Sequence, residues 1–156
     1  MVSNVLHFPA NHAAPSPGLR VLLADDDRDT VLTLATILAD DGHEVRALGG
    51  GAEVPELVRH FDPDVVILDV EMPGRNGYAL ARELREWRMD RRPLLIAISG
   101  IWVKPSERFL AIMVGFDHFF QKPADPKELL AVLADFRAGR GTTRLSERLH
   151  GRAGTG

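Results

Sequence analysis

Four apolar segments of the sequence each lead into residues that suit phosphoryl chemistry. The first is followed by Asp25 and Asp26, the second by Asp69, the third by Ser99 and the fourth by Lys122. A buried carboxylate such as Asp69 is costly unless it has a partner. Clustered carboxylates also repel one another, by about 4 kcal/mol per pair at ~4 Å and an effective dielectric constant of ~20. This arrangement therefore predicts a cation beside the acids.

The residue types indicate which cation and which reaction. Mg²⁺ favours oxygen ligands, takes one or two carboxylates and leaves positions for phosphoryl oxygens. A lysine such as Lys122 can pair with Asp69 at rest and with a phosphoryl group afterwards. The Ser99 hydroxyl can donate a hydrogen bond to a phosphoryl oxygen. These parts match phosphoryl transfer to an aspartate nucleophile, and we expect Asp69 to be the acceptor.

Strand-like and helix-like segments alternate along the chain in a way that would position these residues. Continuous apolar runs indicate buried strands, and apolar residues at helical spacing indicate helices between them. Five strands alternating with five helices predict an α/β fold, a doubly wound five-stranded parallel sheet with helices on both faces, whose ligands bind at the carboxyl ends of the strands. The expected strands are 19–25, 42–48, 65–69, 94–99 and 117–121, and the expected helical stripes include Val31, Leu34, Leu38, Val54, Leu57, Phe61, Leu80, Leu84, Trp87, Phe109, Ile112, Met113, Phe116, Leu129, Leu133 and Phe136.

Size and composition fit one globular domain with flanking segments. The 156 residues are 45% hydrophobic and 26% charged, with a net charge of −3 and no cysteine. The charge favours neither nucleic acid nor an anionic membrane as partner, no apolar run is long enough to span a membrane, and disulfides and thiolate metal sites are excluded. We expect a cytoplasmic protein with a flexible arm over 1–18, a domain over 19–138 and a Gly- and Arg-rich tail over 139–156.

The motifs LLADDD, ILDVEMPGRNG, IAISG and FFQKPAD, in this order, resemble those of the response-regulator receiver domain of two-component signalling. The resemblance covers about Leu19 to Phe136 and implies the flavodoxin-like receiver fold. It also implies a partner, a histidine kinase or histidine phosphotransfer protein, that phosphorylates Asp69. Its metal ligands would be Asp25, acting largely through water, Asp26, Asp69 and the backbone carbonyl of Glu71. Ser99 and Lys122 would contact the phosphoryl group, and Phe119 would be the switch aromatic.

The resemblance further implies a signalling module that catalyses only its own phosphorylation and dephosphorylation. Because no second domain is visible after Phe136, we expect a single-domain receiver whose readout is intermolecular. The reader would be another protein or a second copy of the chain. It would bind the face formed by the fourth helix, the fifth strand and the fifth helix.

Two other functions remain open from the sequence. The stretch DRDTVL fits the signature of haloacid-dehalogenase-type phosphatases, with Asp27 and Asp29 as the reacting acids. Against it, Asp27 lies beyond the strand end, no acidic pair follows Lys122, and no insertion could cap a substrate. A receiver-like scaffold that acts without phosphorylation is the third alternative.

Overall fold

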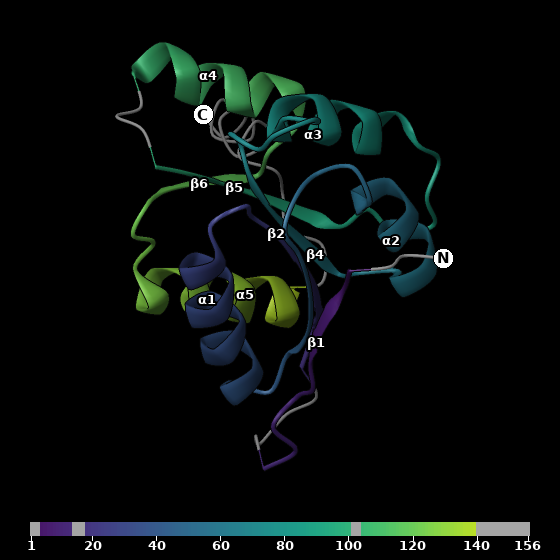
Figure 1. Cartoon of the computed structure of the whole chain (residues 1–156), viewed down its shortest axis with the longest axis vertical. Helices are drawn as coiled ribbons and strands as arrows, with labels where there is room; N and C mark the ends of the chain where they lie inside the picture. Colours follow the sequence, from purple (N-terminus) through teal and green to yellow (C-terminus); the bar gives the residue numbers. More distant parts are fainter. Residues whose placement is uncertain (1–3, 14–17, 101–103, 140–156) are drawn as a thin grey trace, which may run out of the picture.

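The computed structural model describes residues 4–13, 18–100 and 104–139 (Figure 1). Of the expected tail, only Gly139 lies within this range. The described part forms three layers, with a central sheet between two groups of helices. None of its helices combines the length and apolar character that crossing a membrane requires.

The central sheet confirms the expected doubly wound α/β fold. Its strand order is β1-β3-β2-β4-β5-β6, and all neighbours from β3 to β6 are parallel. All residues of the two central strands β4 and β5 are buried, as expected for a sheet covered on both faces. The strands are β1 (Leu6–Phe8), β2 (Arg20–Ala24), β3 (Glu44–Leu48), β4 (Val65–Asp69), β5 (Leu94–Ser99) and β6 (His118–Gln121).

The prediction of five strands was wrong by one, because the segment expected to be a flexible arm contributes β1. This strand pairs antiparallel with β3, with His7 opposite Arg46 (Figure 1). Three residues followed by Pro9 are too short to show an alternating pattern in the sequence. The hydrogen bonds to β3 stabilise β1, so this strand depends on a tertiary contact and not on its local sequence.

Two helical layers cover the sheet, and each has its own apolar core. The helices are α1 (Arg28–Asp40), α2 (Val54–Phe61), α3 (Gly77–Glu86), α4 (Pro105–Val114) and α5 (Pro126–Gly139). On one face, α1 and α5 bury Leu34, Leu38, Leu129 and Leu133. On the other face, the core includes Leu57 and Phe61 of α2, Leu80 and Leu84 of α3, and Ala111 of α4. Most of the predicted helical stripes are therefore core positions.

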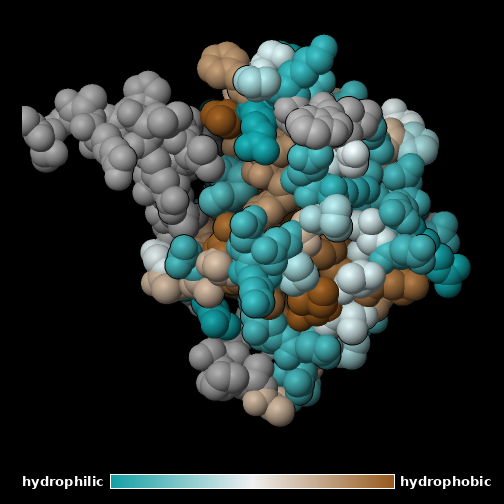
Figure 2. Space-filling view, turned by 90° about the vertical axis from the view of Figure 1, so that its left-hand side faces the viewer, coloured by the Kyte–Doolittle hydropathy of each residue, from teal (hydrophilic) through white to brown (hydrophobic). Residues whose placement is uncertain are grey.

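Helix α4 is the exception to the predicted packing. Gly115 ends it as expected, with φ of 117°, and Phe116 just beyond it is buried. However, Phe109 is 64% exposed and Met113 is 67% exposed, and Ala111 is the buried residue of the helix. The expected helix is therefore present, but Phe109 and Met113 of its apolar stripe face away from the core. Figure 2 shows hydrophobic residues among hydrophilic ones near the top of the molecule, where α4 lies.

Candidate functional site

The carboxyl ends of four neighbouring parallel strands bring the expected site residues to one edge of the sheet. Asp25 follows β2, Asp69 is the last residue of β4, Ser99 is the last residue of β5, and Lys122 follows β6. Asp25, Asp69 and Ser99 are buried, with exposures of 0%, 3% and 3%. Strand order alone thus gathers residues that lie up to 97 positions apart in the chain.

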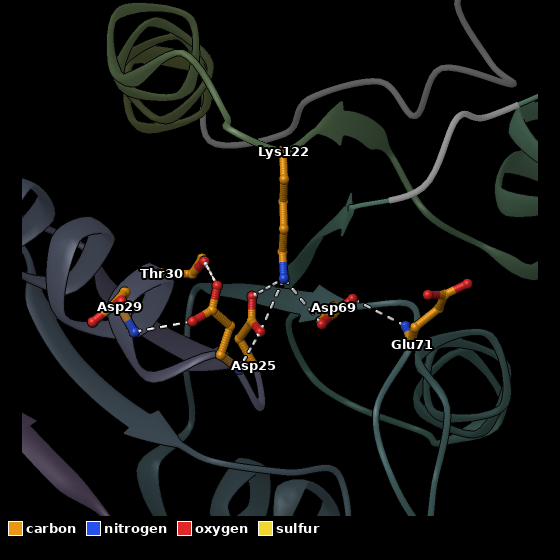
Figure 3. Close-up of polar contacts among 7 residues, drawn as sticks. Asp25, Asp29, Thr30, Asp69, Glu71 and Lys122 are labelled. Carbon is orange, nitrogen blue, oxygen red and sulfur yellow. Dashed lines mark hydrogen bonds and ion pairs between the residues drawn. The ribbon is translucent and has the colours of Figure 1, made fainter.

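Lys122 connects the two buried carboxylates (Figure 3). Its Nζ donates to Oδ1 of Asp25 at 3.0 Å and to Oδ2 of Asp69 at 3.1 Å. The same Nζ lies 2.8 Å from Oδ2 of Asp25. A backbone hydrogen bond from Lys122 N to Ser99 O, 2.7 Å long, fixes the backbone of Lys122 against the end of β5. The ammonium group therefore lies between the carboxyl ends of β2 and β4, next to both acids.

The pKa values of Asp69 and Lys122 are both shifted by burial and by the charges that lie close to them. Burial raises the pKa of Asp69, and the neighbouring charge of Asp25 adds to the rise, against the opposing effects of the Glu71 N–H and Lys122. Burial opposes the charge on Lys122, yet its hydrogen bonds and ion pairs with Asp25 and Asp69 give it a raised pKa. Lys122 is therefore held as an ammonium, while the two acids still repel each other.

The acids could hold a hard divalent cation. Asp25, Asp26 and Asp69 each offer a carboxylate oxygen, and these oxygens all lie within 4.8 Å of one another. Oδ2 of Asp25 is buried and accepts no hydrogen bond, although the Lys122 ammonium is close by. Asp26 is exposed, so the cluster is open to solvent on that side. A set of three carboxylates with only oxygen ligands, open to solvent on one side, fits Mg²⁺.

The loop after β4 holds Asp69 in place. Glu71 N donates to Oδ1 of Asp69 at 3.0 Å, while the Glu71 carboxylate points away from the cluster (Figure 3). Gly77, at the start of α3, lies so close that a Cβ there would be 2.6 Å from the Asp69 carbonyl oxygen. Sequence reasoning missed Gly77, whose only signal was the Asn-Gly pair at the end of the loop. The Glu71 carbonyl as a metal ligand stays a prediction.

Asp27, one of the two acids of the alternative phosphatase signature, has a structural role. The Asp27 side chain caps α1 by accepting from Asp29 N at 3.1 Å and from Thr30 Oγ1 at 2.8 Å. The hydrogen bond from Thr30 lowers the pKa of Asp27. Asp27 N also donates to Oδ1 of Asp25 at 2.9 Å. Asp27 thus caps the helix, and its N–H orients Asp25. Both carboxylate oxygens of Asp27 accept hydrogen bonds from the first turn of α1.

Phe119, the expected switch aromatic, lies on β6, three residues before Lys122. It is partly buried against the core under α2, α3 and α4. The Arg108 guanidinium of α4 lies 5.8 Å from the centre of its ring. Phe119 therefore lies close to Arg108 of α4. It is also connected along β6 to Lys122, which follows that strand directly.

Comparison with known proteins identifies the family of the chain. The family model described as the response regulator receiver domain matches residues 21–134. The aerobic respiration control protein ArcA of Escherichia coli is 33% identical over 109 residues, which cover 70% of this chain and 44% of ArcA. Response regulator MprA of a Mycobacterium species is 35% identical over 113 residues, covering 72% of this chain and 48% of MprA.

Solved structures give the same result. The signal receiver domain of a signal transduction histidine kinase from Syntrophus aciditrophicus superposes with a TM-score of 0.72 and 26% identity, over 82% of this chain and 96% of that one. The chain spans less than half the length of the two curated relatives above. With a family model that matches most of its length, and with the strand-end acids and lysine in place, the chain belongs to the response regulator receiver domain family.

Proposed function

We propose that the protein receives a phosphoryl group on Asp69 from a phosphohistidine of a histidine kinase or phosphotransfer protein. The observation that carries this proposal is the Lys122 ammonium between Asp25 and Asp69, with Asp26 beside them. A scaffold that is never phosphorylated would not need two buried acids at the carboxyl edge of the sheet. The receiver function is assigned to residues 19–138, with the segments before and after as its flanks.

The reaction moves a phosphoryl group from nitrogen to oxygen. A carboxylate oxygen of Asp69 attacks phosphorus, the new O–P bond forms as the N–P bond breaks, and the electron pair of that bond returns to the imidazole nitrogen. Lys122 can follow the negative charge from the Asp69 carboxylate to the phosphoryl oxygens. Ser99, at the end of the adjacent strand, donates to another phosphoryl oxygen. The Glu71 N–H keeps the Asp69 carboxylate oriented while it reacts.

The residues that would hold Mg²⁺ are Asp25, largely through water, Asp26, Asp69 and the backbone carbonyl of Glu71. When bound, the ion supplies positive charge against the phosphoryl oxygens. The chain's own contribution is to keep the three carboxylates within reach of one another and to hold the Lys122 ammonium against the two buried ones.

We propose that the protein acts as a cytoplasmic signalling module and not as an enzyme on a separate substrate. Phosphorylation adds about −1.5 to −2 charge and three acceptor oxygens. Ser99 moves toward these oxygens, and Phe119 turns into the space behind it. The surface of α4, β6 and α5 changes as a result, and an effector protein or a second copy reads it. The exposed Phe109, Leu110 and Met113 of α4 support this face as the partner surface.

The acceptor is tested with a small-molecule phosphodonor. We expect phosphoramidate and Mg²⁺ to label the wild-type protein with one acid-stable, base-labile phosphoryl group. Asp69→Asn keeps the side-chain shape and removes the nucleophile, so labelling is lost while circular dichroism is unchanged. Asp29→Asn is the matched control, because Asp29 is an exposed acid at the start of α1. Full labelling of Asp69→Asn would refute the assignment.

The switch is tested by NMR or amide exchange with and without beryllofluoride, a phosphoryl mimic. We expect changes at residues 25–30 and 69–77 and also at residues 104–122. Ser99→Ala should keep the first two sets and lose the third, since the hydroxyl transmits the change. If residues 104–122 stay silent in the wild-type protein, the switch does not exist in this form.

A further inference from the structure

Strand β1 lies outside the part of the chain that the family model matches. The match begins at residue 21, whereas β1 is Leu6–Phe8. In Figure 1 the purple β1 runs along the outer side of the sheet, where it pairs with β3. Without β1, the order of the strands would leave β3 at the edge. The segment therefore covers an edge that the rest of the receiver fold leaves open.

Contacts made by β1 and by residues on either side of it hold this strand in place. Phe8 packs against the core under α1 and α5, and Val5 packs against the core of the other face. His7 Nε2 lies 3.2 Å from Oε1 of Glu44 on β3. Asn11 N donates to the Ala39 carbonyl at 2.9 Å, at the end of α1, where carbonyl groups lack helical partners. The segment is thus fixed to β3 and to α1.

The attachment is nevertheless weak compared with that of the other strands. Leu6 and His7 are exposed and Phe8 is only partly buried, whereas every residue of β4 is buried. An edge strand with few buried side chains can be displaced at small cost, and an uncovered edge is a template for another strand. β3 fits that template well, because its five residues carry three buried apolar side chains and no proline.

The sequence of β3 is self-complementary in the antiparallel sense. If Val45 of one copy lies opposite Val45 of another, Glu44 of each copy lies opposite Arg46 of the other. Opposite charges directly across an antiparallel pair are stabilising. A pairing of identical strands about a two-fold axis also closes the assembly at a dimer. At the other edge, β6 has four residues and is soon followed by Pro123, which lacks an N–H, so it is a poorer template.

We propose that residues 5–11 are a guard strand for the β3 edge. Bound in cis, the segment blocks pairing between two receivers. When it leaves, the edge accepts β3 of a second copy, with Glu44 opposite Arg46 on both sides of the axis. The N-terminal segment therefore controls self-association at a surface separate from α4, β6 and α5.

The test uses the full chain, which has no native cysteine. Glu44→Cys and Arg46→Cys chains are mixed and oxidised, because the proposed register places these two positions opposite each other. With the guard strand intact, we expect little disulfide-linked dimer. Adding Phe8→Asp to both chains puts a charge where Phe8 meets the core and frees β1, so the mixture should form the dimer. Each cysteine chain alone should cross-link poorly, since identical positions are then out of register.

Two controls separate edge exposure from general damage. Phe109→Asp makes the same change at a side chain that is 64% exposed on α4, and it should not promote cross-linking. His7→Cys with Arg46→Cys joins the two directly paired positions of β1 and β3 in one chain. When oxidised, this pair should keep Phe8→Asp chains at the monomer mass of 17.2 kDa. Reduction of the disulfide should then allow these chains to dimerise.

Amide exchange at residues 6–8 reports whether β1 has left. If Phe8→Asp does not speed this exchange, His7→Pro is added, since proline cannot take part fully in the ladder. Fast exchange at residues 6–8 without cross-linking between the Glu44→Cys and Arg46→Cys chains would overturn the proposal. Equal cross-linking with and without Phe8→Asp would overturn it as well.

Discussion

Replacing Lys122 by methionine removes an ammonium that lies 2.8 Å from Asp25 and 3.1 Å from Asp69. Loss of one partner from a buried ion pair costs about 3–5 kcal/mol. The lysine side chain is 18% exposed, so we expect the lower end, ~3 kcal/mol, in the absence of Mg²⁺. For a domain of this size that corresponds to a fall in melting temperature of roughly 6–12 °C.

Mg²⁺ should reverse much of this loss. In the mutant, the lysine no longer offsets the repulsion between Asp25 and Asp69, whose carboxylate oxygens lie within 4.8 Å of each other. At an effective dielectric constant of ~20 this repulsion is at least about 3.5 kcal/mol. A ligand at 100 times its Kd adds about 2.7 kcal/mol to the stability of the folded state. The stabilisation by Mg²⁺ should therefore be larger in Lys122→Met than in the wild-type protein.

The assay is thermal unfolding followed by circular dichroism in EDTA and in Mg²⁺. Lys127→Met is the matched control, because Lys127 is an exposed lysine on α5. It should change the melting temperature little in either buffer. An unchanged melting temperature of Lys122→Met in EDTA would show that the lysine does not offset the two carboxylates. A smaller Mg²⁺ response than in the wild-type protein would refute the electrostatic reasoning.

Three further predictions follow from the same structure. Mg²⁺ should raise the melting temperature of the wild-type protein, and Asp26→Ala should remove most of the rise; an equal rise in the mutant would place the metal elsewhere. Burial lowers the pKa of His43, so the unfolded state binds more protons, and stability should fall as pH drops below about 6.5. Urea titrations should show this slope and its loss in His43→Leu, which should also be about 1–3 kcal/mol less stable at pH 7 because Leu19 N loses its acceptor. Asp27→Ala should cost about 1 kcal/mol as a lost helix cap without abolishing phosphoryl uptake; loss of uptake in a folded protein would restore a direct role for Asp27.

The layout of the parallel sheet could be predicted because the physics of strand ends is simple. Buried parallel strands read as continuous apolar runs, and the residue after each run must lie at the carboxyl edge. Asp69 and Lys122 are 53 positions apart, yet they meet because β4, β5 and β6 are neighbours. The gathering of the acids and the lysine followed directly from that order.

Other features depend on tertiary contacts that no local pattern encodes. Strand β1 forms only because β3 offers an open edge, and its three residues carry no periodicity. The outward orientation of Phe109 and Met113 depends on how α4 lies on the core, which an apolar stripe cannot specify. The need for glycine at Gly77 arises from its close approach to the Asp69 carbonyl. The roles of Ser99 and Phe119 concern a phosphorylated state and remain proposals.

The central claim is that Asp69 is the residue that becomes phosphorylated. Borohydride reduces an aspartyl phosphate to homoserine, so peptide mass spectrometry after phosphorylation and reduction locates the acceptor. We predict conversion at Asp69, dependent on both the phosphodonor and Mg²⁺, with Asp25 and Asp26 unmodified. Conversion at another aspartate, or a stable phosphoryl group without any conversion at Asp69, would contradict the claim.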